Sequence, residues 1–454
     1  MAPVVLREQR PRMPWGVIAA GVLAAVYILT PVLALGMRVP WAHLPKTLSA
    51  PETHDLLRTT LTAAVISTVF STCLGTCLAL WLHQLRRVSH LVRLVVYLPL
   101  AMPPVVGGLA LTALLGRRGL LGPVLEQLGA HVAFAFPGVV AAHLFVTLPF
   151  VVVAVDSALR QLDAEVVASA RSVGLGPGSI LRHIILPAIL PAVLTGGALA
   201  FARSLGEFGT TITFAGSLPG ITRTMPSGIY LEREVSADNA YALSALLIGI
   251  AILTLAVAGL PLLLRRRRGQ AVRSVQPLDA AALRAATAPH VSPRELTVTV
   301  GEATTTFRGG RVTAVVGPNG AGKTTLMRFI SGRLRGAQTN AERVVMLTQN
   351  PGLPPTATVR QVLTMVTKDA QRTEDLLRAA GLQELGHVSE LSGGQAAQVA
   401  LLRALAARPE VLVVDEPFAA MDVASAARWR HLLRLAAPER TTIIVTHSRV
   451  DLTT

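Results

Sequence analysis

The sequence has few charged and few aromatic residues for its length. Of its 454 residues, 15% are charged and 4% are aromatic, whereas 51% are hydrophobic. An ordinary globular domain carries about 25% charged residues, so we expect part of this chain to lie in lipid. The shortage of aromatic rings leaves little for stacking on nucleic-acid bases.

Lysine is almost absent, and arginine supplies most of the positive charge behind the net +16. The only lysines are Lys46, Lys323 and Lys368. A basic chain is typical of proteins that bind nucleic acid or a membrane surface. We interpret the arginines as the cytoplasmic flanks of membrane spans and predict no nucleic-acid partner.

Cysteine is scarce as well, with Cys73 and Cys77 four residues apart in an apolar stretch. That spacing places both on one helix face. A metal or redox site would need more ligands nearby, so we interpret them as small packing residues. No signal peptide is predicted, because the first apolar run, 15–37, is too long and lacks an obvious small-residue cleavage site.

Long hydrophobic runs dominate the first 264 residues. A bilayer core of about 30 Å needs roughly 20 apolar residues in a helix. After a cytoplasmic tail at 1–14, the sequence predicts an all-α membrane domain over 15–264. Its expected spans are 15–37, 57–82, 91–115, 136–156, 184–206 and 240–264.

Arginine clusters set the expected orientation of these spans. They occur in the connections 83–93 and 157–183 and in the run 265–268. Positive charge concentrates on the cytoplasmic side of membrane proteins, so we expect both ends of the chain in the cytoplasm. The loops then predicted outside also carry some positive charge, at Arg38, Lys46, Arg117, Arg118 and Arg223. We predict a multi-pass protein of the bacterial cytoplasmic membrane, surrounded by lipid.

Beyond the last span, the pattern changes to that of a soluble domain. Residues 265–293 are basic, rich in Ala and Pro and without apolar periodicity, so we interpret them as a linker. From 294 to 454, short apolar runs alternate with helical stretches, which indicates a parallel α/β domain. The expected strands include 312–317, 343–349, 411–417 and 441–447.

The stretch "GPNGAGKTT" fits the phosphate-loop pattern G-x-x-x-x-G-K-[ST] between a strand and a helix. Inward-pointing backbone N–H groups and the helix N-terminus form an anion site. Lys323 is expected to reach the β- and γ-phosphates of ATP, and the Thr324 hydroxyl to help hold Mg²⁺. The residues predicted to bind ATP here are Gly317, Pro318, Asn319, Gly320, Ala321, Gly322, Lys323, Thr324 and Thr325.

Two acidic residues, Asp415 and Glu416, end the apolar strand 411–414. We predict that Asp415 binds Mg²⁺, directly or through water, and that Glu416 orients the attacking water. Such a pair alone would more commonly be a helix cap or a solvated pair; the phosphate loop upstream favours the functional interpretation.

A second glycine-rich turn, "LSGGQ" at 391–395, precedes a helix expected from about Ala396. Bare backbone N–H groups at a helix start can bind an anion, although Ser392 could equally act only as a helix N-cap. The spacing from Lys323 does not place this turn in the same phosphate cradle.

Residues 311–447 resemble the nucleotide-binding domain of an ABC transporter. The phosphate loop matches the Walker A motif of that family, "VLVVDE" its Walker B and "LSGGQ" its signature. The resemblance implies that two domains face head to tail, so that Ser392, Gly393, Gly394 and Gln395 close on ATP held by the other copy. It also implies a D-loop Asp422 in "AAMD", a Mg²⁺-associated Q-loop Gln349 and a catalytic switch residue His447, beside catalytic Glu416 and Lys323.

Some features depart from the family pattern. The distance from Lys323 to Gln349 is short, so we expect part of the antiparallel β-subdomain to be missing. Phe307 is the one weak candidate for stacking on adenine. The sequence ends soon after His447, where the family normally continues, and the signature is followed by Ala396 and Ala397 rather than by a polar pair.

The connection 157–187 resembles the cytoplasmic coupling motif of binding-protein-dependent ABC importers, E-A-A-x₃-G-x₉-I-x-L-P. Gly174, Ile184, Leu186 and Pro187 fall in register, but Ala168 and Ser169 occupy the glutamate and first alanine positions, and Glu165 lies three residues early. The resemblance implies short helices that dock beside the Q-loop. An ordinary amphipathic loop is the alternative.

The stretch 202–230 is most similar to molybdate permeases; its "GEFG" part is shared with sulfate and tungstate permeases. A permease fused to its ATPase is therefore expected. It would work as a homodimer with an extracytoplasmic oxyanion-binding protein and import molybdate. Sulfate or tungstate import remains an alternative. So does a regulatory or degenerate subunit that binds ATP without turnover; an exporter is disfavoured by the coupling motif.

Glu207, within that stretch, is the unexpected charge at the end of an apolar run. An ionised carboxylate would repel an anionic substrate. Arg203 lies one helical turn earlier and can neutralise it, and Gly206 and Gly209 would let another helix approach closely. We interpret Arg203 and Glu207 as a structural pair or an element of a gate.

Overall fold

The computed structural model describes residues 14–85, 89–264 and 277–446, apart from Asn319 and Arg335. It divides into two compact units. One, the helical unit, comprises residues up to Asp156 together with Ala192–Leu264. The other, the α/β unit, comprises Ser157–Pro191 and the chain beyond Arg265. The predicted connection 157–183, together with the first residues of the predicted span 184–206, thus belongs with the C-terminal domain.

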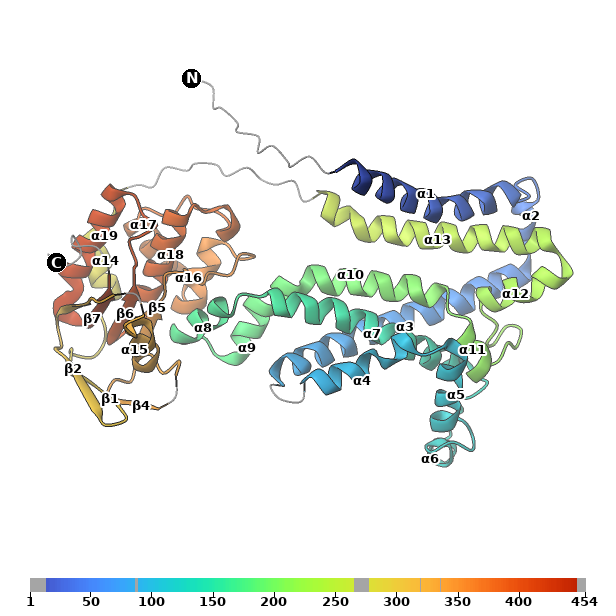
Figure 1. The fold of residues 1–454 in the computed structure, drawn as a ribbon, viewed down its shortest axis with the longest axis horizontal. Coiled ribbons are helices and arrows are strands. Elements are labelled where there is room, and N and C mark those ends of the chain that lie inside the picture. Colours follow the sequence, from blue (N-terminus) through green and yellow to red (C-terminus); the bar gives the residue numbers. More distant parts are fainter. Residues whose placement is uncertain (1–13, 86–88, 265–276, 319, 335, 447–454) are drawn as a thin grey trace, which may run out of the picture. The chain divides into compact units, whose positions relative to one another are not determined.

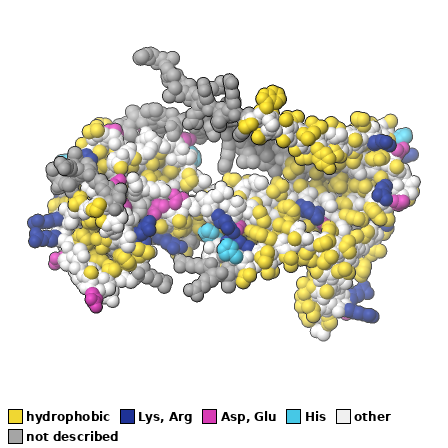
Figure 2. Space-filling model, in the orientation of Figure 1, with side chains coloured by type: hydrophobic (Ala, Val, Ile, Leu, Met, Phe, Trp, Pro, Cys, Tyr) yellow, Lys and Arg dark blue, Asp and Glu magenta, His cyan; other side chains and the backbone are white. Residues whose placement is uncertain are grey.

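The helical unit contains long apolar helices that match five of the six expected spans (Figure 1). The long helices are α1 (Trp15–Arg38), α3 (Pro51–Gln84), α7 (Phe136–Gln161), α13 (Ala237–Leu264) and the run Pro177–Leu205, which ends in α10 (Leu186–Leu205). Short helices connect them: α2 (Leu44–Ser49), α6 (Gly122–Gln127), α11 (Gly209–Phe214) and α12 (Met225–Val235). The visible surface over these helices is largely apolar (Figure 2), as expected for contact with lipid.

The remaining expected span, 91–115, is not one helix. It consists of α4 (Ser89–Ala101) and α5 (Pro104–Leu115), whose axes meet at 115°. Pro103 and Pro104 explain the break, because each proline lacks a backbone N–H and disfavours helical geometry in the residue before it. The predicted span 91–115 is therefore interrupted rather than one straight helix, and the break creates a helix N-terminus inside the unit.

Buried polar side chains and close helix contacts hold the helical unit together. Ser71 of α3 hydrogen-bonds Thr147 of α7 at 2.7 Å, and His143 of α7 hydrogen-bonds Ser204 of α10 at 2.6 Å. Such hydroxyl and imidazole contacts link helices where the surroundings offer no water. Arg93 of α4 also forms two 3.0 Å hydrogen bonds with Asp156 of α7.

The α/β unit is built around the predicted parallel sheet. Its strand order is β3-β7-β6-β5, comprising β3 (Val312–Val315), β7 (Thr441–Val445), β6 (Val411–Asp415) and β5 (Val344–Leu347). All three pairings in this sheet are parallel. Buried β6 and β7 are continuous apolar or β-branched runs, as a strand covered on both faces requires.

Helices and a second sheet complete this unit. The helices are α8 (Ala164–Ser172), α9 (Pro177–Ile180), α14 (Ala280–Thr287), α15 (Lys323–Ile330), α16 (Val359–Thr367), α17 (Ala370–Ala379), α18 (Gly393–Ala406) and α19 (Val423–Ala436). The second sheet is antiparallel, with order β2-β1-β4, from β1 (Leu296–Val300), β2 (Ala303–Phe307) and β4 (Ala337–Thr339). Phe307 is 5% exposed within the core beside this sheet, so it is not available to stack on adenine.

The expected linker 265–293 contains an ordered helix, α14. Leu283 on this helix is fully buried in the core of the α/β unit. Arg440, also buried, donates to the Thr287 carbonyl at 2.7 Å, and burial lowers the pKa of Arg440 to about 10. The prediction of a linker is therefore wrong for α14. Its alanine-rich sequence contains a single large apolar residue, Leu283, which gave little sign of a buried helix.

We expect Gly108→Ala to destabilise the helical unit. A Cβ at Gly108 of α5 would lie 2.5 Å from Cβ of Thr213 in α11, so the two helices must separate. Gly249→Ala in α13 is the matched control, because its added methyl meets nothing within 4 Å. Thermal unfolding of the purified chain should show a lower midpoint for Gly108→Ala than for Gly249→Ala; equal midpoints would contradict this packing.

Candidate functional site

The predicted phosphate loop lies between β3 and the start of α15. Gly320 and Gly322 adopt φ values of 84° and 83°, a left-handed conformation that glycine tolerates best. The Lys323 ammonium donates to the carbonyls of Gly317 and Pro318 at 2.6 and 2.8 Å. The Lys323 side chain therefore lies against the backbone of this loop, where it can bind phosphate. Pro318, Ala321 and Thr325 are placed here as well, whereas Asn319 is outside the described residues.

Two expected Mg²⁺ ligands meet at the end of β6. The Thr324 hydroxyl donates to Oδ2 of Asp415 at 3.2 Å. A hydroxyl and a carboxylate are the oxygen donors that Mg²⁺ prefers, so this pair fits the ion. Gln349, the third expected ligand, instead donates from Nε2 to Oε2 of Glu416 at 3.2 Å.

Glu416 lies directly after β6 in an unusual backbone conformation. Its φ is 47°, and its N–H donates to the Val445 carbonyl of β7 at 2.9 Å. A positive φ is uncommon for a residue with a side chain and often marks a functional site. Gln349 and Glu416 also line a pocket of about 360 Å³ together with Gly393 at the signature turn. His447 lies outside the described residues.

The signature turn caps α18. Ser392 accepts a hydrogen bond from the Gln395 N–H at 3.2 Å, and the Gln395 side chain accepts from the Ser392 N–H at 3.0 Å. This capping box starts the helix at Gly393, earlier than the Ala396 expected from the sequence. The N-cap alternative for Ser392 is thus present within the chain. Any contact with a second copy would be additional to it.

The expected D-loop residue Asp422 caps α19. Its carboxylate accepts from the Ser425 N–H at 2.9 Å, and hydrogen bonds from Ser425 lower the pKa of Asp422. The preceding segment passes close to the signature turn, because a Cβ on Gly394 would lie 2.8 Å from the Ala420 carbonyl oxygen. Gly394 therefore has a packing role within one chain.

The predicted coupling segment forms two short helices packed into the α/β unit. Gly174, at φ 88°, makes the turn after α8. Ile184 is 2% exposed and belongs to the same core as β5 and α18. It lies in a single π-helical turn, Leu181–Ile185, that leads into α10, where Leu186 is exposed and Pro187 half-buried. The expected short helices beside the Q-loop are present.

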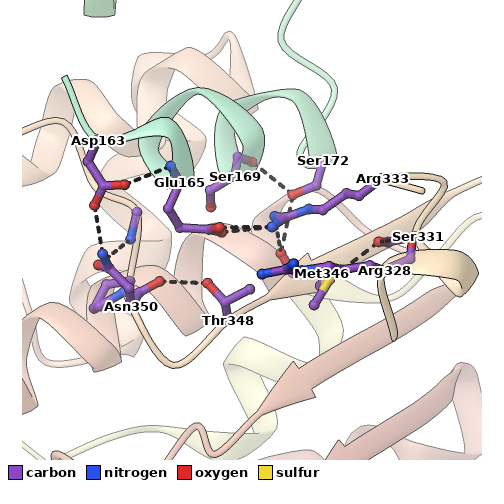
Figure 3. Close-up of polar contacts among 12 residues, drawn as sticks. Asp163, Glu165, Ser169, Ser172, Arg328, Ser331, Arg333, Met346, Thr348 and Asn350 are labelled. Carbon is purple, nitrogen blue, oxygen red and sulfur yellow. Dashed lines mark hydrogen bonds and ion pairs between the residues drawn. The ribbon is translucent and has the colours of Figure 1, made fainter. Parts of the chain in front are cut away.

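Polar contacts fasten α8 and its N-cap to Arg333, which follows α15, and to Asn350, which follows β5 (Figure 3). Arg333 donates to both carboxylate oxygens of Glu165 at 2.8 and 3.1 Å. Asn350 donates to Asp163 at 2.7 Å, and Asp163 also caps α8 through the Glu165 N–H. Both of the bonds to Glu165 come from Nη1 of Arg333, and the two side chains are mostly buried, so this charge-assisted contact is largely shielded from water.

A buried arginine joins this contact to the signature helix. Arg403 of α18 is 3% exposed and donates to the Ser169 hydroxyl of α8. Its guanidinium also donates to the carbonyls of Pro351 and Gly352, each at 3.2 Å. Burial lowers the pKa of Arg403 to about 10, and nearby Glu165 partly opposes that shift. One guanidinium thus connects α18, the Q-loop stretch and α8.

Sequence reasoning missed the partners in this contact. The motif assigned its glutamate position to Ala168, whereas Glu165 makes the ion pair from nearly one turn earlier on the helix. The spacing of Glu165 and Ser169, at i and i+4, was the available signal that both lie on one face. Arg333, Asn350 and Arg403 carried no local signal, because their roles depend on distant residues.

Arg203 and Glu207 form the expected ion pair, with 2.7 Å between Nη2 and Oε2. The other carboxylate oxygen of Glu207 accepts from the Thr210 N–H at 2.9 Å. A Cβ on Gly209 would lie 2.6 Å from the Cβ of Pro104, so α5 approaches closely there. Gly206 has no comparable neighbour among the described residues.

Comparison with known proteins finds a family match in each half of the chain. Residues 71–269 match the family described as "Binding-protein-dependent transport system inner membrane component", and residues 300–419 match the family described as "ABC transporter". The "Molybdenum transport system permease protein ModB" of Mycobacterium bovis is 40% identical over 248 residues, covering 54% of this chain and 94% of that protein. This chain belongs to the binding-protein-dependent ABC transporters. It is a multi-pass membrane permease fused to an ATPase domain.

Other relatives match the permease half of this ABC transporter chain. The protein of the same name in Escherichia coli strain K12 is 41% identical over 159 residues, covering 35% of this chain and 69% of that protein. "Sulfate transport system permease protein CysW" of Synechococcus elongatus is 35% identical over 169 residues, covering 37% and 58%. The predicted family and fold class, an all-α membrane permease followed by an α/β ATPase domain, are confirmed.

We expect Gly394→Ala to lower the thermal stability of the α/β unit, since its new Cβ would clash with the Ala420 backbone. Gly393→Ala is the matched control, because its Cβ would lie 3.7 Å from the Ala420 side chain, an ordinary contact. Thermal unfolding should separate the two variants. A Gly393→Ala chain less stable than Gly394→Ala would contradict the packing described here.

We expect Gly352→Ala to loosen the contact between α8 and the ATPase domain. A Cβ there would lie 2.8 Å from both the Glu165 carbonyl oxygen and the Ser169 Cβ. Gly301→Ala is the control for backbone strain, since both glycines have positive φ but Gly301 has open space around it. Protease cleavage of the 157–191 segment should accelerate in Gly352→Ala alone; equal rates in both variants would contradict the contact.

Proposed function

We propose that this chain is half of an ATP-driven importer of a tetrahedral oxyanion, and that the oxyanion is molybdate. The observation that carries the proposal is the docking of α8 on the ATPase domain through Glu165–Arg333 and Ser169–Arg403. It supplies a physical link between ATP-driven movement and the permease helices. A molybdenum permease matches the permease half over 248 residues, whereas the sulfate permease of Synechococcus elongatus matches it over 169.

ATP would bind with its phosphates in the loop before α15. Backbone N–H groups of the loop and the Lys323 ammonium would bind the phosphate oxygens, the ammonium exchanging its contacts with the Gly317 and Pro318 carbonyls for them. Thr324 and Asp415 would hold Mg²⁺, which neutralises charge on the phosphates. Closure of a second domain would exclude water from this site.

Glu416 would act as the base for hydrolysis. Its carboxylate accepts the proton of the attacking water, which it orients toward the terminal phosphate. Gln349 donates to this carboxylate and so restricts its rotation. Because Gln349 also begins the stretch that contacts α8, movement around Glu416 can reach the coupling segment. His447 is proposed to contact the terminal phosphate.

Two copies of the chain are proposed to form the complete importer. A fused chain supplies one permease and one ATPase domain, and a two-fold axis would provide the second of each. Ser392 and Gly394 of each copy would then close on ATP held by the other. An extracytoplasmic binding protein would deliver the anion to the permease in the bacterial cytoplasmic membrane.

We expect Glu416→Gln to abolish turnover while ATP still binds. Losing a general base lowers the rate of the chemical step by about 10²–10⁴-fold, whereas the phosphate loop is untouched. Glu302→Gln, at an exposed position in the turn between β1 and β2, is the control that removes a carboxylate elsewhere. ATPase rates and nucleotide binding of the full chain in lipid would be measured. Equal hydrolysis by parent and Glu416→Gln would favour a subunit without productive turnover.

Uptake assays decide the substrate. Cells with and without this chain, each supplied with its binding protein, would be given molybdate, tungstate or sulfate. We expect chain-dependent uptake of molybdate, lost in Glu416→Gln. Uptake of sulfate alone would overturn the assignment of molybdate but keep the importer, and no chain-dependent uptake would overturn both.

A further inference from the structure

A small pocket lies where two broken helices of the permease meet. Its volume is about 210 Å³. It is bounded by the break between α4 and α5, by α7, and by the end of α10 and the start of α11. The residues that matter for the argument are Met102, Pro103, Pro104, Gly107, Arg203 and Thr210.

Among the described residues, Arg203 is the one cation in the wall of this pocket. Its side chain keeps 30% of its surface exposed, whereas that of its partner Glu207 keeps 1%. An arginine in a membrane domain faces the bundle interior or a water-filled cavity rather than lipid, because burying its charge in hydrocarbon is costly. The exposed part of Arg203 therefore marks a hydrated space.

Glu207 holds this arginine in place. One oxygen of its carboxylate contacts Nη2 of Arg203, and the other accepts from the Thr210 N–H. A guanidinium has five N–H donors in a rigid plane, and among the described residues Glu207 is the one acceptor that the Arg203 side chain contacts. Donors on Arg203 thus remain to serve a ligand, while the carboxylate is turned toward α11.

Thr210 adds a second donor that lacks a partner. Its side chain is fully buried, and its Oγ1 has no hydrogen-bond partner in the described structure. That oxygen lies 3.5 Å from the position that a Cβ on Gly107 would take, and both residues line the pocket. A buried hydroxyl without a partner is costly, so a polar ligand in the pocket would satisfy it.

The N-terminal end of α5 adds an electrostatic field that favours an anion. This helix has 12 residues, and the prolines at its start line the pocket. Its N-terminal end carries partial positive charge. Transporters place the N-termini of discontinuous helices toward anionic substrates in this way. The pocket is therefore a cation-lined space with the chemistry to receive an anion.

We propose that this pocket is an anion-binding site on the transport route, where the Arg203 guanidinium and the Thr210 hydroxyl donate to a tetrahedral oxyanion. Glu207 is a positioning residue that orients Arg203. The Glu207 charge also weakens binding, which lets the anion leave again, as conduction requires. This inference rests on the proposed oxyanion importer and identifies where its substrate contacts the permease.

The matched pair Thr210→Val and Thr211→Val tests the hydroxyl. Both threonines lie in α11, are buried and have an Oγ1 without a partner in the described structure, but only Thr210 lines the pocket. Molybdate transported per ATP hydrolysed would be measured in proteoliposomes with the binding protein. We expect a several-fold loss in Thr210→Val and parental values in Thr211→Val; equal values in both would overturn the role of Thr210.

Arg203 requires variants that separate binding from packing. Arg203→Gln leaves Glu207 buried and unpaired, so Arg203→Gln/Glu207→Gln provides a neutral pair that can still hydrogen-bond. Arg233→Gln, at an exposed arginine, controls for loss of one charge. We expect transport per ATP to fall about tenfold, equivalent to about 1.4 kcal/mol, in the single and double variants alike. Recovery in the double variant would show that Arg203 is only structural.

A direct binding measurement tests the anion site separately from the proposed import function. Molybdenum NMR of molybdate with the full chain in nanodiscs reports even weak, rapidly exchanging binding as line broadening. We expect broadening by the parent chain and less by the Arg203→Gln/Glu207→Gln variant. If the parent broadens the line in this Arg203-dependent way yet imports no oxyanion, the transport function fails and the site stands. Transport without Arg203-dependent broadening would overturn the site alone.

Discussion

The hydrogen bonds of one buried guanidinium connect three separate segments of the α/β unit. Arg403 donates to Ser169 of α8 and to the carbonyls of Pro351 and Gly352. Burying a charge is costly unless hydrogen bonds compensate for the lost water, so separating any of these partners from Arg403 carries a cost. The helix that begins at the signature turn, the stretch after Gln349 and α8 are therefore held to one another by these hydrogen bonds. The Glu165–Arg333 pair adds a second attachment on the same face of α8.

Charge in the permease half follows a related logic. Its buried ionic groups occur as pairs, Arg93 with Asp156 and Arg203 with Glu207. The first pair is nearly buried, with side chains 12% and 3% exposed, and it joins α4 to α7. The second exposes its arginine to a pocket and hides its carboxylate. Pairing of opposite charges thus links two helices at Arg93 and Asp156, whereas at Arg203 and Glu207 it leaves the arginine accessible to a ligand.

Motifs whose chemistry is local were predictable from the sequence. The phosphate loop, the Asp415–Glu416 strand end and the signature turn each lie in the context expected of them, because each depends on a few consecutive residues between a strand and a helix. Most spans were predictable as well, since length and apolarity suffice to define a span. The break between α4 and α5 was less accessible, because membrane helices often continue through proline when neighbours satisfy the freed backbone groups.

Contacts between distant residues lay beyond the sequence. The alanine-rich sequence of α14 is typical of a linker, but in the structure Leu283 is buried and Arg440 hydrogen-bonds the end of this helix. Phe307, the sequence candidate for stacking on adenine, is buried at the end of β2. The sequence by itself determined the order of a helical membrane half and an α/β half, most of the membrane spans and the position of the phosphate loop, because periodicity and short motifs encode them. Only the tertiary structure decided which distant polar side chains meet, since Glu165 and Arg333, or Arg403 and Ser169, become neighbours only when the chain folds back on itself.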